Sequence, residues 1–162
     1  MELSGQPGVM TEAMKRIART RGDEPRNLPA TIEGEADLVT VDTTWGELQP
    51  IQPVPGIRTV GELELTELAT SGALLIDTRV PDSRSGITIP GAVNISHEEI
   101  AERRDELDRE RISVLFCNGP QCPQTPKALR ALLDAGYPAA SLVYYRGGLH
   151  DWITLAMPTQ AT

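Results

Sequence analysis

Two cysteines have the type and spacing that suit nucleophilic chemistry. Cys117 directly follows the apolar run 113–116, and Cys122 comes five residues later in the segment 118–124. The glycine and prolines of this segment allow a loop whose backbone amides converge on one point, and such an arrangement of amides favours an anion. Because the thiolate is the nucleophilic form of cysteine, this loop makes Cys117 a candidate reactive thiol.

The residues after the loop predict a helix. Thr125 suits the N-cap position, and Pro126 suits the first helical turn, where its missing N–H has no partner to lose. Apolar residues then recur at helical spacing, and Gly136 marks the predicted end. The partial positive charge at a helix N-terminus would add to the anion preference of the loop. The alternative is that Cys117 only ends a buried strand, since free cysteines are often buried and inert.

Cys122 has three interpretations. It could form a disulfide with Cys117, resolve an adduct formed on Cys117, or fill space in a stiffened loop. A separation of five residues permits disulfide geometry without requiring it. Two cysteines are too few for a disulfide scaffold, and both histidines, His97 and His150, lie far from them in the sequence. We therefore predict no metal site and assign no cofactor.

The rest of the sequence predicts the elements that hold the loop. Short apolar runs indicate strands that are buried on both faces. Helical stretches separate these runs, and strands alternating with helices predict βαβ units in a parallel sheet. Ligands of such sheets bind beyond the carboxyl ends of the strands, which is where Cys117 falls. The predicted strands are residues 73–76, 92–95, 113–116 and 142–145.

Capping signals indicate where other helices begin. A hydroxyl residue followed three positions later by a glutamate is typical of a capping box, in which side chains satisfy the exposed amides of the first helical turn. A helix is predicted after each of two such pairs, and a short third helix is expected around Trp152. The pairs are Thr59 and Glu62, with a predicted helix end near 71–72, and Ser96 and Glu99, with an end near Leu107.

The N-terminal third differs in composition. Residues 10–20 carry apolar residues at helical spacing and predict a short amphipathic helix, whereas residues 30–56 are rich in proline, glycine, threonine and acidic residues. This second part is predicted to be extended, either laid over a domain or acting as a linker. It is also a candidate for binding a partner, including a second copy in a homodimer. We place the boundary between an N-terminal extension, 1–56, and a single α/β domain, 57–162.

Composition and charge argue against several function classes. Of the 162 residues, 40% are hydrophobic and 23% are charged, which is typical of a globular protein. The net charge of −8 argues against a nucleic-acid-binding surface, because phosphate contacts need clustered lysine and arginine. No apolar stretch is long enough to cross a membrane, and the N-terminus lacks the pattern of a secretory signal. We therefore expect a cytoplasmic protein without nucleic-acid or membrane partners.

Four segments together resemble the rhodanese-homology family. They are 75–79 (LIDTR), 89–95 (IPGAVNI), 114–117 (VLFC) and 145–148 (YRGG), the last followed by Asp151, Trp152, Met157 and Pro158. The resemblance covers residues 57–160 and implies a rhodanese-like three-layer α/β fold, with a mostly parallel five-stranded sheet flanked by helices. It also implies sulfane-sulfur transfer through a persulfide on Cys117.

The same resemblance assigns supporting residues. The loop after the cysteine would bind the sulfur-carrying anion, whereas residues at other strand ends would brace that loop. The loop residues are Asn118, Gly119, Pro120, Gln121, Cys122, Pro123, Gln124 and Thr125. The bracing residues are Asp77, Arg79, Gly147 and Gly148.

One departure from the family pattern concerns charge. Typical members have an arginine within the loop, whereas no arginine or lysine lies between Cys117 and Thr125, and Lys127 is the nearest cation. An arginine would bind a dianion such as thiosulfate through paired donors, so thiosulfate binding is expected to be weak. Pro123 stands where phosphatase relatives hold phosphate with arginine, which argues against that activity. The CNGPQC sequence instead resembles a two-cysteine variant of the rhodanese loop.

Three functions are compatible with these features. The first is a sulfurtransferase or persulfide carrier that takes sulfur from a small donor and passes it from Cys117 to a thiol acceptor, either a small molecule or a protein. The second is a thiol redox or oxyanion-reducing protein that uses Cys117 with Cys122. The third is a non-enzymatic module that binds a partner through residues 1–56 or the acidic surface. The position of Cys117 and the family resemblance favour the first.

Overall fold

The computed structural model describes residues 30–32, 34–40, 48–84 and 86–162. The chain divides into two compact units, Met1–Trp45 and Gly46–Thr162. The helix predicted at 10–20 lies outside the described residues.

In the first unit, strands β1 (Ala30–Ile32) and β2 (Glu35–Thr40) pair antiparallel. Gly34, between them, has a φ of +80°, a conformation that glycine adopts without strain. The prediction of a merely extended segment missed this hairpin.

The second unit contains a five-stranded sheet, and every neighbouring pair in it is parallel. This confirms the predicted α/β fold with a mostly parallel sheet. The strand order is β3-β8-β7-β4-β6, so β7 is the central strand and carries Cys117 at its carboxyl end. The strands are β3 (Arg58–Val60), β4 (Leu74–Asp77), β6 (Val93–Asn94), β7 (Ser113–Phe116) and β8 (Leu142–Tyr145).

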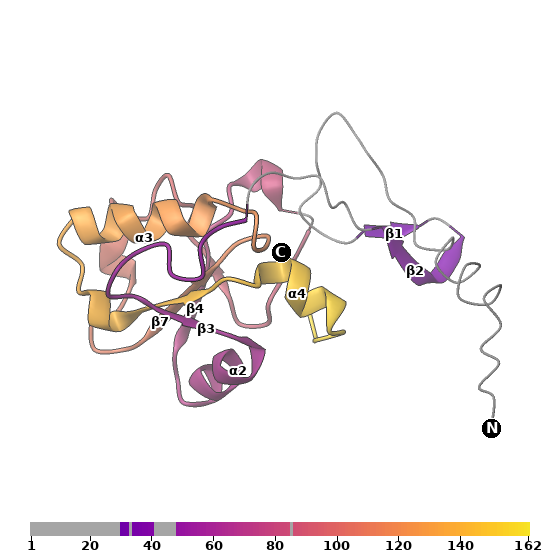
Figure 1. Ribbon diagram of the computed structural model, residues 1–162, viewed down its shortest axis with the longest axis horizontal. Coiled ribbons are helices and arrows are strands. Elements are labelled where there is room, and N and C mark those ends of the chain that lie inside the picture. Colours follow the sequence, from indigo (N-terminus) through magenta and orange to yellow (C-terminus); the bar gives the residue numbers. More distant parts are fainter. Residues whose placement is uncertain (1–29, 33, 41–47, 85) are drawn as a thin grey trace, which may run out of the picture. The chain divides into compact units, whose positions relative to one another are not determined.

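Three helices flank this sheet: α2 (Glu62–Thr70), α3 (Gln124–Asp134) and α4 (Gly148–Thr154). Figure 1 shows α2 and α3 on opposite sides of the strands, with α4 following the end of β8. All four residues of β7 and of β8 are buried, as expected for strands covered on both faces. The main apolar cluster joins alternate strand residues to one face of α3, and its members include Ile76, Leu115, Tyr144, Ala128, Leu129 and Leu132.

Two predicted helix starts are shifted in the structure. Thr59 does not cap α2, because it belongs to β3 and its hydroxyl donates to the Ile51 carbonyl at 2.5 Å. Gly61 is the N-cap instead, and its N–H donates to Glu64. Likewise, Thr125 is not the N-cap of α3, which begins at Gln124.

The α-helix predicted from Ser96 to Leu107 is wrong. The Ser96 hydroxyl does donate to Glu99 at 3.1 Å, but the segment forms successive turns and then a 3₁₀ helix, Arg104–Glu106. Ile100 and Leu107 are buried, whereas the residues between them are alanine and charged side chains. A short segment with so few apolar anchors gains little from packing an α-helical face, and most helical stability comes from such packing.

Residues 48–56 lie on the second unit as an extended segment with bends. Val54 belongs to the main apolar cluster, and Arg130 of α3 donates to the Pro53 carbonyl at 3.4 Å. These contacts hold Pro53 and Val54 against α3 and the apolar cluster. None of the described helices is long and apolar enough to span a membrane.

Candidate functional site

The two cysteines are brought together by a loop that folds back on itself. The Cys122 N–H donates to the Gly119 carbonyl at 3.0 Å, and the Cys117 thiol donates to the Cys122 carbonyl at 3.6 Å. A hydrogen bond also links the two thiols, which are both free. Cys117 is 1% exposed and Cys122 is fully buried, so neither sulfur is open to solvent in this conformation.

The first turn of α4 contacts the start of this loop. The N–H of Leu149 donates to the Cys117 carbonyl at 3.0 Å, and the N–H of His150 donates to the Asn118 carbonyl at 2.7 Å. Gly148 makes this approach feasible, because a Cβ there would lie 2.4 Å from the Cys117 oxygen, and its φ is +59°. A Cβ at Gly147 would instead meet the side chain of Asp151. The close backbone approach expected at the glycine pair therefore occurs at Gly148.

A buried ion pair braces the residue that follows Cys117. Arg79 and Asp77 are 0% and 1% exposed, and their side chains are joined by an Nη2 to Oδ2 contact of 2.6 Å and an Nε to Oδ1 contact of 2.9 Å. Arg79 also donates to Asn118 Oδ1 at 3.1 Å and to the Ile87 carbonyl at 2.7 Å, while Asp77 accepts from the Thr88 hydroxyl. These two residues stabilise the loop and do not touch the sulfurs in any described contact.

Gln124 connects Cys122 to the segment after β4. Its Oε1 accepts from the Val80 N–H at 2.8 Å, while its Nε2 lies 3.4 Å from Cys122 Sγ. The Val80 N–H can only donate, so the side-chain atom beside it must be the oxygen. The amide nitrogen is therefore the atom that faces Cys122, and it donates a hydrogen bond to that sulfur.

Two hydroxyl residues lie beside Cys117: Thr125, which was predicted as a loop residue, and Thr78, which sequence reasoning missed. Thr78 lies just past β4, where its Oγ1 is 3.0 Å from the Phe116 carbonyl and 2.9 Å from Thr125 Oγ1. Thr125 in turn hydrogen-bonds Cys117 through its hydroxyl and its backbone N–H. The position of Thr78 directly after the apolar run of β4 was the available signal, because the carboxyl ends of parallel strands meet at one edge.

The protonation of the pair differs from the expectation for Cys117. Burial raises the pKa of Cys117 well above its usual value, and the hydrogen bond and charge of Cys122 raise it further. The hydrogen bond from Cys117, aided by the backbone N–H groups of Gln124 and Asn118, lowers the pKa of Cys122 to about 6. The surroundings therefore favour ionisation of Cys122 over ionisation of Cys117.

Gln49 ties residues 48–56 to the cysteine loop, a contact that sequence reasoning did not find. Its N–H donates to the Pro120 carbonyl at 2.7 Å. Its carbonyl accepts two hydrogen bonds from the Arg146 guanidinium, at 2.9 Å from Nε and 2.7 Å from Nη2. Gln49 thus links the middle of the loop to the end of β8.

Replacing Arg146 with glutamine is expected to increase the labelling rate of the two thiols by a small-molecule alkylating reagent. Both sulfurs are buried, so labelling requires the loop to open, and Arg146 holds Gln49 against Pro120. Loss of about 1.5 kcal/mol of charged hydrogen bonding corresponds to roughly a tenfold increase in opening. Arg130→Gln is the matched control, since it removes a single bond to Pro53 in the same segment. If both variants are labelled at the wild-type rate, the hydrogen bonds between Arg146 and Gln49 do not limit the access of reagents to the two thiols.

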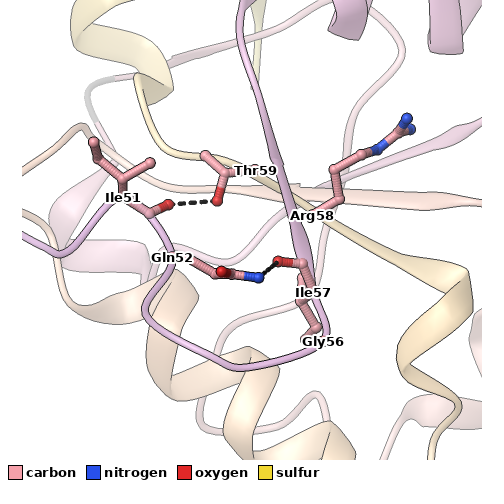
Figure 2. A pocket seen from close by; sticks show the side chains of 6 residues that line it. All are labelled: Ile51, Gln52, Gly56, Ile57, Arg58 and Thr59. Atoms are coloured by element: carbon pink, nitrogen blue, oxygen red, sulfur yellow. Dashed lines mark hydrogen bonds between the residues drawn. The ribbon is translucent and has the colours of Figure 1, made fainter.

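A recess on the second unit is lined by residues other than the cysteines. It has a volume of about 450 Å³ and is lined by Ile51, Gln52, Gly56, Ile57, Arg58 and Thr59. Figure 2 shows the Gln52 and Thr59 side chains turned to backbone carbonyls, while the Arg58 guanidinium points away from them. None of these lining residues is a nucleophilic cysteine or a member of the loop. Within the described ranges, no group of three or more histidine, cysteine, aspartate or glutamate side chains could hold a metal ion.

A family model described as Rhodanese-like domain matches residues 63–155, which is more than half of the chain. The chain belongs to the rhodanese-like domain family. Its fold is similar to that of a rhodanese-related protein from Thermoplasma volcanium, with 20% identity over 64% of this chain and 97% of that one, at a TM-score of 0.51. It is also similar to the rhodanese-like domain of an Anabaena protein, with 22% identity over 64% and 79% of the chains and a TM-score of 0.54.

Two further similarities bear on this rhodanese-like chain. A thiosulfate sulfurtransferase from Pseudomonas aeruginosa is 22% identical over 65% of this chain and 20% of its own, with a TM-score of 0.53. At this identity the likeness concerns the fold alone. The HTH-type transcriptional regulator Rv0324 of Mycobacterium tuberculosis is 28% identical over 147 residues, which are 91% of this chain. The chain spans 63% of that regulator's length.

Proposed function

We propose that this rhodanese-like chain carries sulfane sulfur as a persulfide on Cys117 and passes it to a thiol acceptor. The observation that carries the proposal is the place of Cys117. It stands at the carboxyl end of the central strand β7, where its sulfur receives hydrogen bonds from Thr125. Rhodanese-like domains share this fold, and the edge beyond the strands is where parallel α/β sheets bind ligands.

The transfer begins with the proton of Cys117. Its thiol already donates to the Cys122 thiolate, so Cys122 takes the proton as Cys117 attacks the outer sulfur of a persulfide donor. The S–S bond of the donor breaks, a new S–S bond forms on Cys117, and the donor leaves as a thiol that carries away the proton held by Cys122, which returns Cys122 to its thiolate form. The hydroxyl and N–H of Thr125 stabilise negative charge on the loaded sulfur. A thiol acceptor then removes the outer sulfur and regenerates Cys117.

The charges of the site favour some donors over others. Two arginines that contact the loop or the segment tied to it are engaged: Arg79 by Asp77, and Arg146 by the Gln49 carbonyl. Neither presents a free guanidinium for a dianion such as thiosulfate, which guanidinium groups bind through paired donors. An alkyl persulfide carries at most one negative charge and an organic polysulfide carries none, whereas thiosulfate is a dianion, so we propose persulfides and organic polysulfides as the donor class.

Intact-mass analysis tests this proposal. After brief exposure to a small alkyl persulfide or a polysulfide, the wild-type protein is expected to gain one sulfur atom or to release sulfide. Cys117→Ser is expected to do neither, because the attacking sulfur is absent. Thiosulfate is expected to load the protein much more slowly than either donor. If Cys117→Ser takes up sulfur as the wild type does, Cys117 is not the carrier.

A second candidate function is a sensory module for gene regulation. The 147 residues that match the mycobacterial regulator exceed the length of the segment 57–162, so the similarity also includes part of residues 1–56. A sensory module would change state once per protein molecule, whereas a sulfurtransferase turns over with excess donor and acceptor. Binding of a partner that is lost when residues 1–56 are removed, without turnover, would favour the sensory function. The cytoplasmic location and the homodimer through 1–56 stay predictions.

A further inference from the structure

The geometry of the loop makes Cys122 the nearest thiol to any sulfur carried by Cys117. The Cys122 N–H to Gly119 bond closes the turn, and the Cys117 sulfur contacts both the carbonyl and the thiol of Cys122. Reacting groups held in contact behave as if present at very high concentration, so an internal attack competes strongly with any external thiol.

Burial adds to this advantage. Cys117 is 1% exposed and Cys122 is fully buried, while Gln49 and the first turn of α4 hold the loop from two directions. An external acceptor must open this arrangement before it can reach the outer sulfur. Cys122 can react without opening of the loop, because its sulfur already lies beside Cys117 within the closed loop.

The surroundings of Cys122 suit an attacking thiolate. The Gln124 amide nitrogen lies 3.4 Å from its sulfur, and the backbone N–H groups of Asn118 and Gln124 also donate to it. These donors favour the ionised form, which is the nucleophile of thiol chemistry. The same donors have no described contact with Cys117, so the site distinguishes the two sulfurs.

We propose that Cys122 resolves the Cys117 persulfide, so that the protein releases hydrosulfide and forms a Cys117–Cys122 disulfide. This inference rests on the proposed persulfide of Cys117. The Cys122 thiolate attacks Cys117 Sγ, a bond forms between the two Sγ atoms, and the bond from Cys117 Sγ to the outer sulfur breaks. The outer sulfur leaves with the electron pair as HS⁻ and is reduced, while the two cysteines are oxidised. Two equivalents of a small thiol then reduce the disulfide and restore the pair.

The test uses the full chain, reduced and freed of reductant, with one equivalent of a small alkyl persulfide. The wild type is expected to release nearly one equivalent of sulfide and to lose two hydrogens in mass, in a form that a thiol reductant reverses. Cys122→Ser is expected to load more slowly, because it lacks the thiolate that accepts the Cys117 proton. Once loaded, it is expected to keep a stable gain of one sulfur on Cys117 and to release sulfide at least about tenfold more slowly, as expected for loss of an internal nucleophile. Cys122→Ala repeats the comparison, and thermal unfolding verifies that both variants are folded.

Gln124→Glu provides a variant that keeps both cysteines. A carboxylate oxygen can still accept from Val80, but it replaces the donor beside Cys122 Sγ with a negative charge. Sulfide release in the wild type is expected to rise with pH to a midpoint at the pKa of Cys122 in the sulfur-loaded protein, because the thiolate is the attacking form. In Gln124→Glu this midpoint is expected to move to higher pH. A purely structural role of Gln124 would lower the amplitude without moving the midpoint.

The failures of the two proposals are distinguishable. A wild-type protein that retains a stable persulfide on Cys117, or a Cys122→Ser variant that releases sulfide at the wild-type rate, overturns the resolving role and leaves the carrier function intact. Absence of both sulfur uptake and sulfide release in the wild type overturns the carrier function, and the resolving role is lost with it.

Discussion

Replacing Arg79 with methionine is expected to lower the free energy of unfolding by about 3–5 kcal/mol, because it leaves the Asp77 carboxylate buried without its partner. The guanidinium is fully buried and donates to Asp77, Asn118 and the Ile87 carbonyl, so a single substitution removes all of these bonds. Chemical denaturation followed by circular dichroism measures the change. Methionine retains much of the side-chain volume, which limits the contribution of a cavity.

A double-mutant cycle separates the ion pair from the packing. Asp77→Leu with Arg79→Met is expected to be less destabilised than the sum of the two single variants, since neither charge is then left unpaired. Arg103→Met is the matched control, because Arg103 bonds Glu106 on the surface and should unfold like the wild type. A loss in Arg79→Met no larger than that in Arg103→Met would contradict the structural role assigned to the buried pair.

The sheet and α3 could be predicted because their signals are carried by the local sequence. Apolar runs such as 113–116 fill both faces of a central strand, and α3 has apolar residues at helical spacing over its whole length. The segment 96–107 shows the limit of such signals. Its capping pair forms the expected hydrogen bond, yet no α-helix follows. A capping pair stabilises only the first turn of a helix, whereas the remaining turns depend on the packing of an apolar face. Strand β3 was missed because three residues carry little periodicity.

The candidate site was predictable in position but not in detail. Cys117 follows a buried strand, and that order is visible in the sequence. The contacts that control it join residues far apart, such as Gln49 with Arg146 and Thr78 with Thr125, and no local pattern encodes them. The direction of the Cys117 pKa was wrong for a related reason. The composition of the loop predicts backbone amides that would lower the pKa of Cys117. The burial of Cys117 and the nearby charge of Cys122 raise that pKa, and both depend on how the loop closes.

Gly148→Ala is expected to lower the free energy of unfolding by at least about 2 kcal/mol and to displace the cysteine loop. Two effects add. The φ of +59° is strained for alanine, and the new Cβ would lie 2.4 Å from the Cys117 oxygen and 2.7 Å from the Gly119 nitrogen. Both neighbours are backbone atoms, so relief requires the loop itself or α4 to move. Denaturation measures the stability, and the rate of thiol labelling reports the displacement, which should increase.

Gly136→Ala isolates the strain from the collision. Gly136 follows α3 with a φ of +84°, and a Cβ there would have no atom within 4 Å. Its substitution is therefore expected to destabilise by about 1 kcal/mol through backbone strain and to leave the cysteine labelling rate unchanged. The additional loss of stability in Gly148→Ala, relative to Gly136→Ala, measures the cost of the collision between the new Cβ and the backbone of the cysteine loop. If Gly148→Ala and Gly136→Ala lose equal stability and label at equal rates, the loop accommodates a Cβ at Gly148, and α4 does not fix the position of Cys117.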